Sequence, residues 1–87
     1  MKDGAWFKHD MNVVLRILEV CQSLQGRLNG WTCVRNRTDL NSGTFKKYIG
    51  YLSGKGYIEV SDIGHRHRTI EITPQGINFL KYLKENL

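Results

Sequence analysis

The chain has 87 residues, which is enough for one domain with one modest hydrophobic core. Hydrophobic residues make up 40% of the composition and fall into regular patterns, which argues against a disordered protein. The longest apolar stretch, MNVVLRILEV, is interrupted by Arg16 and Glu19 and is too short to span a bilayer. We therefore expect a soluble intracellular protein that does not enter a membrane.

The positive charge is concentrated in the middle of the chain. The formal net charge is +5 at pH 7. Between residues 27 and 68, eight lysines and arginines stand against three acidic residues, so this segment carries the whole net charge. A basic surface of this kind favours a polyanionic partner.

The first part of the chain predicts two helices after an irregular segment of residues 1–9, in which Trp6 and Phe7 are expected to pack on the rest. From Asp10 the sequence follows a helical period, and one face carries Val14, Ile17, Leu18, Cys21 and Leu24. Gly26 and Gly30 are stop signals for this helix. The short apolar piece WTCVRN predicts about two turns of a second helix.

A third helix follows the polar turn TDLNSG. Asn41 or Ser42 can cap its start, because both side chains accept hydrogen bonds from free backbone amides. One face of this helix carries Phe45, Tyr48, Ile49 and Leu52. Gly54 and Gly56 are expected to end it.

Two alternating runs, YIEVSD and RTIEIT, predict a β-hairpin. Pairing Ile58 with Ile72 and Val60 with Ile70 places four β-branched residues on one face, with residues 63–67 as the tip. Thr73 then caps a final helix of residues 74–87, with Pro74 in the first position.

This order of elements predicts an α+β fold, a winged helix-turn-helix with a three-helix core, a two-stranded wing and a C-terminal helix in one domain of residues 1–87. The segments ILEVCQSLQG, DLNSGTFKKYIGYLSGKGYIEV and TIEITPQGINFLKYL resemble the winged-helix family of small basic archaeal DNA-binding proteins and related archaeal transcription regulators. The resemblance implies binding to double-stranded DNA.

In a helix-turn-helix, the second helix of the motif enters the major groove. If the apolar face of the third helix is buried, Gly43, Lys47, Gly50 and Gly54 point outward. Gly50 has two explanations, close approach of the backbone to DNA or simple tolerance of glycine. The residues predicted to contact DNA are Arg35, Arg37, Ser42, Thr44, Lys46, Lys47, Tyr51, His65, Arg66, His67 and Arg68. For Arg35 and Arg37, the alternative is that they belong to a solvated charged face and contact no partner.

The hairpin tip carries the sequence His-Arg-His-Arg at residues 65–68. A zinc site there would need three or four ligands, and His9 is only a loose third candidate, so no metal is expected. Arg68 faces Asp62 in the proposed register, and a cross-strand pair is its alternative role. We expect the tip to follow the DNA backbone or to enter the minor groove, where a narrow groove attracts arginine.

The apolar positions of the last helix cover more than half of its circumference. Ile77 and Leu80 can face the wing and the first helix, which leaves a partly exposed surface for a homodimer. The predicted interface residues are Phe79, Tyr82, Leu83 and Leu87. In the alternative, Trp6 and Phe7 cover this surface in a monomer.

The sequence thus predicts a double-stranded DNA-binding homodimer of the cytoplasm, associated with the nucleoid, either a transcription regulator or a small chromatin-like protein. The alternative is a winged-helix module that binds proteins and not DNA. No paired carboxylates, nucleophile–base set or glycine-rich phosphate loop is present, so no enzyme, cofactor or small-molecule substrate is expected. Cys21 and Cys33 form no C-x-x-C motif and are expected to be buried, reduced thiols.

Overall fold

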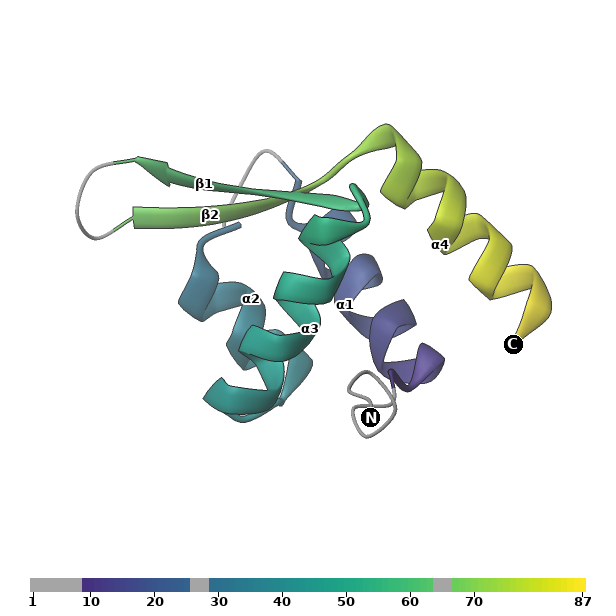
Figure 1. Ribbon diagram of the computed structural model, residues 1–87, viewed down its shortest axis with the longest axis horizontal. Coiled ribbons are helices and arrows are strands. Elements are labelled where there is room, and N and C mark those ends of the chain that lie inside the picture. Colours follow the sequence, from purple (N-terminus) through teal and green to yellow (C-terminus); the bar gives the residue numbers. More distant parts are fainter. Residues whose placement is uncertain (1–8, 26–28, 64–66) are drawn as a thin grey trace, which may run out of the picture.

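Within the described residues, three helices, a β-hairpin and a fourth helix follow one another. The computed structural model describes residues 9–25, 29–63 and 67–87. The elements are α1 (Met11–Ser23), α2 (Trp31–Thr38), α3 (Ser42–Gly54), β1 (Ile58–Ile63), β2 (His67–Ile72) and α4 (Pro74–Asn86). Figure 1 shows the β1–β2 wing projecting from one side of the helices, while α4 lies at the opposite side. The predicted winged helix-turn-helix fold is confirmed.

Side-chain caps explain where three of the helices begin. Asp10 caps α1 by accepting a hydrogen bond from the amide of Asn12. Asn41, and not Ser42, caps α3 by accepting from the amide of Thr44 at 2.9 Å. Thr73 caps α4, with Pro74 next in the chain as predicted. Each such cap contributes about 1 kcal/mol to the stability of its helix.

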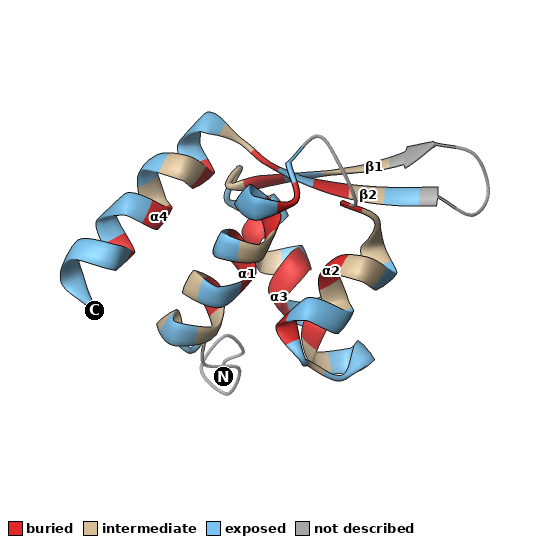
Figure 2. Cartoon of the chain, turned by 180° about the vertical axis from the view of Figure 1, so that it is seen from behind, coloured by how far each residue is buried: buried red, intermediate tan, exposed pale blue. Residues whose placement is uncertain are grey.

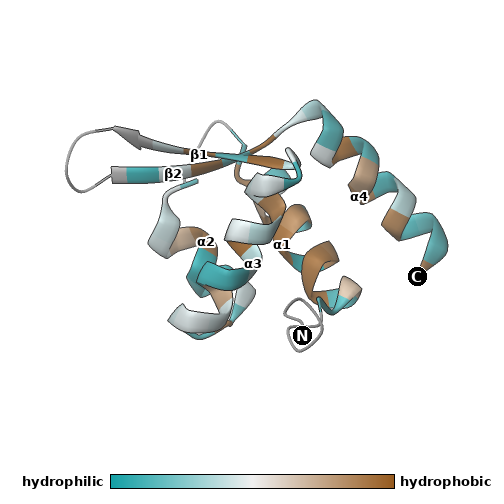
Figure 3. Cartoon of the chain, viewed as in Figure 1, coloured by the Kyte–Doolittle hydropathy of each residue, from teal (hydrophilic) through white to brown (hydrophobic). Residues whose placement is uncertain are grey.

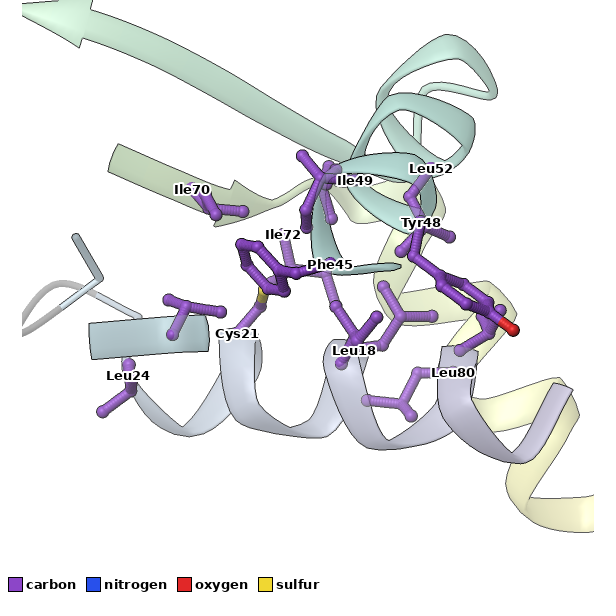
Figure 4. Packing of buried hydrophobic residues seen from close by; sticks show 14 of the residues in the cluster. Leu18, Cys21, Leu24, Phe45, Tyr48, Ile49, Leu52, Ile70, Ile72 and Leu80 are labelled. Atoms are coloured by element: carbon purple, nitrogen blue, oxygen red, sulfur yellow. The ribbon is translucent and has the colours of Figure 1, made fainter. Parts of the chain in front are cut away.

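The core lies where α1, α2 and α3 meet the base of the wing. The predicted apolar faces of α1 and α3 are buried, and Figure 4 shows Phe45 packed beside Leu18 and Cys21. In Figure 2 the buried residues of each helix face inward, toward the other elements. Cys33 is only partly buried, which corrects the expectation that both thiols are in the core. No helix within the described part of the chain is both long and apolar enough to cross a membrane.

The hairpin has the predicted register, with Ile58 opposite Ile72 and Val60 opposite Ile70. The strands extend one pair further than expected, to Ile63 and His67, so the predicted tip is shorter. The chain segment before α2 joins the edge of the wing, because the amide of Ile70 donates to the carbonyl of Asn29 at 2.8 Å.

The orientation of α4 differs from the prediction at one residue. Leu83 was expected to be partly exposed, but it is buried, with only 2% of its surface accessible. The buried face of α4 runs through Gly76, Leu80 and Leu83, which follow the i, i+4, i+7 spacing of one helix stripe. Leu83 is therefore a core residue and is removed from the candidate dimer interface.

Candidate nucleic-acid interface

A tight turn fixes the angle between α2 and α3. Thr38 is fully buried, and its hydroxyl donates to the carbonyl of Arg35 at 2.7 Å. The guanidinium of Arg16 on α1 donates to the carbonyl of Thr38 at 3.2 Å. Asp39 then takes a left-handed conformation with φ of 62°, which short polar side chains tolerate. The start of α3 is thereby held in place by α1 and α2.

The outward face of α3 contains only small and basic residues. The sequence of this helix has no acidic residue. Its exposed positions are Ser42, Gly43, Lys46, Lys47, Gly50, Ser53 and Gly54. Thr44 is half-buried. A β-carbon at Gly50 would meet no atom within 4 Å, so nothing inside the protein requires glycine there. The predicted outward positions are confirmed as exposed, and Figure 3 shows much of α2 and α3 as polar, in contrast with the hydrophobic α1.

Tyr51, one of the predicted contact residues, is partly covered. The imidazole of His9 stacks on its ring with centroids 3.7 Å apart, and the ammonium of Lys55 lies 5.8 Å from the same ring. Burial lowers the pKa of His9 below 6.5, and the charge of Lys55 lowers it further. Only part of the Tyr51 ring therefore remains available to a partner. Sequence reasoning missed this contact, because no pattern links residues so far apart.

The two arginines of α2 differ in their surroundings. Arg35 is half-buried and donates to the carbonyl of Leu40 at 3.4 Å, so its side chain also stabilises the turn before α3. Arg37 is exposed near the end of α2. Of the two, Arg37 presents the freer charge to an anionic partner.

Arg68 on the wing is exposed, and its guanidinium carbon lies 4.0 Å from the centre of the Trp31 ring. The predicted register opposite Asp62 is confirmed. The sequence pattern gave no signal for the contact with Trp31. His65 and Arg66 lie outside the described residues, and His67 is described only as the first residue of β2.

The described ranges contain no group of three His, Cys, Asp or Glu side chains placed to hold a metal ion. Burial raises the pKa of Cys21 to about 12, so this thiol stays protonated at neutral pH. The zinc alternative for His65 and His67 falls on residues whose side chains are not described.

Comparisons with known proteins agree with this architecture. Residues 8–86 match the family described as winged helix-turn-helix. The structure is similar to the crystal structure of Sso10a-2, a DNA-binding protein from Sulfolobus solfataricus, with a TM-score of 0.75 and 22% sequence identity. The similarity covers 90% of this chain and 77% of the other. A search of curated proteins gives no match. At this level of identity the likeness concerns the fold.

Proposed function

We propose that this chain, which belongs to the winged helix-turn-helix family, binds double-stranded DNA through α3 and the wing. The observation that carries the proposal is the outward face of α3, on which every exposed residue is small or basic. In this fold class the second helix of the motif enters the major groove with its N-terminal end, which here presents Ser42, Thr44 and Lys46. Hydroxyls and ammonium groups at a helix start suit phosphates and base edges.

The distribution of charge supports the same surface. Residues 27–68 hold the entire net charge of +5. Within this segment Arg37, Lys46, Lys47, Lys55 and Arg68 are exposed. The sequence of the wing tip adds further basic residues at 65–67, and we assign the tip to the DNA backbone or the minor groove. This assignment rests on the sequence, since the tip side chains at residues 65–67 are not described.

We propose that the protein acts as a transcription regulator or a small chromatin-like protein in the cytoplasm, on the nucleoid. We also propose that it forms a homodimer through the exposed side of α4, now limited to Phe79, Tyr82 and Leu87. A dimer doubles the number of phosphate contacts and presents two copies of α3 to one duplex.

The test is the salt dependence of duplex binding, measured by fluorescence anisotropy with labelled DNA. If the protein neutralises roughly five phosphates, the logarithm of affinity falls against the logarithm of salt concentration with a slope of about −4 to −5. An Arg37→Gln, Lys46→Gln variant should reduce this slope by about two. A Lys81→Gln, Lys84→Gln variant removes the same charge from α4 and should leave the slope nearly unchanged.

Binding that is insensitive to salt would contradict the proposal, as would equal losses in the two variants. Equal losses would mean that only total charge matters and that α3 forms no defined interface. Salt-insensitive capture of a protein partner would instead favour the alternative of a protein-binding winged helix.

A further inference from the structure

Arg68 and Trp31 form a stacked pair where the wing meets the helices. Arg68 shares one face of β2 with the buried Ile70 and Ile72, so it points to the side of the wing that covers the helical core. There its guanidinium lies over the Trp31 ring, 4.0 Å from the ring centre. A stack of this kind is a cation–π contact that fixes the plane of the guanidinium.

Trp31 itself is held from two directions. Its ring meets the buried ring of Phe45 edge to face, with centroids 5.1 Å apart. The backbone just before it is attached to β2, because Gly30 forms a bridge with Thr69 and the Asn29 side chain donates to Glu71 at 3.2 Å. Trp31 therefore links the wing to the first turn of α3.

The stack covers a face of the guanidinium, and within the described residues no ion pair or hydrogen bond engages its edges. These edges carry the N–H groups that bind phosphate oxygens in pairs. A guanidinium that is already fixed loses little rotamer freedom when it binds. Arg68 is exposed. Glu71, three residues further along β2, lies on the opposite face of the strand and accepts a hydrogen bond from the Asn29 side chain. Asp62 is the register partner of Arg68, and its side chain lies outside the described residues.

We propose that Arg68 is a preorganised contact to one backbone phosphate of duplex DNA, and that Trp31 is the residue that positions it. The inference rests on the proposed function and deepens it, because it assigns a partner group to strand β2 of the wing. The distance between this phosphate and the groove that receives α3 is then set by the Arg68–Trp31–Phe45 contacts.

The experiment is a double-mutant cycle on duplex affinity at several salt concentrations. Arg68→Ala should weaken binding roughly tenfold and reduce the log–log salt slope by about one. Arg68→Lys should restore the slope but not the affinity, because lysine offers no planar pair of donors. Trp31→Leu should weaken binding in the parent protein and have no further effect in the Arg68→Ala protein. Trp31→Tyr keeps an aromatic face and should retain most of the affinity.

Independent, additive losses from Arg68→Ala and Trp31→Leu would overturn the positioning role. If Trp31→Leu proves unfolded by circular dichroism, Trp31→Tyr and Arg68→Lys still decide the question. If the parent protein binds duplex and the Arg68→Ala variant binds with equal affinity and equal salt slope, this inference is wrong but the proposed function stands. A parent protein that binds no duplex removes the proposed function and this inference with it.

Discussion

Gly76 lies directly against the backbone carbonyl of Tyr57, where a β-carbon would collide with the oxygen. The contact joins the first turn of α4 to the turn between α3 and β1. The hydroxyl of Thr73 donates to the carbonyl of Gly56 at 2.6 Å, and the amide of Thr73 donates to the carbonyl of Tyr57 at 3.0 Å. These contacts fix the position of α4 against the base of the wing.

The first prediction concerns this contact. Gly76→Ala places a methyl group against the Tyr57 carbonyl and the Ile72 side chain, so α4 has to shift. Overpacking of this kind costs about 1–3 kcal/mol, and we expect the free energy of unfolding to fall by that amount. Urea unfolding followed by circular dichroism measures it. A variant as stable as the parent would show that the first turn of α4 moves without cost.

The second prediction uses a glycine in the opposite situation. Gly50 sits in the middle of α3 with open space around it, so Gly50→Ala should raise the free energy of unfolding by about 0.5–1 kcal/mol through helix propensity. If the α3 backbone approaches DNA closely at this position, the same variant should bind duplex more weakly. Because the variant is more stable, unfolding cannot explain such a loss.

Gly54→Ala is the matched control for binding, since Gly54 is also exposed with open space but lies at the far end of α3. Unchanged affinity in the Gly50→Ala protein would mean that glycine is merely tolerated at this position.

Local patterns predicted the fold well. The 3.6-residue period of α1 and α3 identified the buried faces, because a helix on one small core needs a single apolar stripe. The alternation of Ile58, Val60, Ile70 and Ile72 predicted the hairpin register, since a shift by one residue would turn the apolar pair of one strand away from that of the other. Both signals depend only on neighbours along the chain.

Contacts between distant residues escaped prediction. Leu83 was assigned to the surface because Ile77 and Leu80 were expected to face the core, whereas the buried face of α4 runs through Gly76, Leu80 and Leu83. Gly76 packs directly against the Tyr57 carbonyl, a contact that hydrophobic periodicity does not reveal. The stacks of Arg68 on Trp31 and of His9 on Tyr51 join residues from separate elements, and no period in the sequence encodes such pairs. The sequence predicted that the surface is basic, but it did not predict which of the basic residues are held by contacts with other side chains.

The third prediction concerns the histidines of the wing tip. An ordinary histidine pKa near 6.5 means that His65 and His67 gain charge as the pH falls from 8 to 6. If they lie against phosphates, duplex affinity should rise over this range. Replacing both residues by glutamine should flatten the rise, as measured by anisotropy at constant ionic strength.

His9 provides the matched control. Burial and the nearby charge of Lys55 hold its pKa below 6.5, so it takes up its proton at lower pH than an ordinary histidine. His9→Gln should therefore leave most of the rise in affinity between pH 8 and 6 intact. If the rise instead vanished with His9→Gln and survived the double replacement at the tip, the titrating group would lie beside α3.

The last prediction is dimerisation through the exposed side of α4. Tyr57 stacks on Phe79 with ring centroids 4.3 Å apart, and Phe79 lies nearly parallel to Tyr82 at 6.1 Å. Tyr82 and Leu87 are 57% and 59% exposed, large values for apolar side chains in so small a protein. A contact surface explains this exposure, because a second copy of α4 would cover both residues.

Sedimentation equilibrium at micromolar concentration should then give twice the chain mass of 10.1 kDa. Tyr82→Glu, Leu87→Glu should give a folded monomer, because these residues contribute little to the core, whereas Lys81→Glu changes an exposed neighbour and should remain dimeric. Leu83→Glu is unsuitable as a probe, since it would place a charge in the core. A parent protein that sediments as a monomer would contradict the dimer. In that case each chain would present a single α3 to DNA, in place of two helices about 34 Å apart.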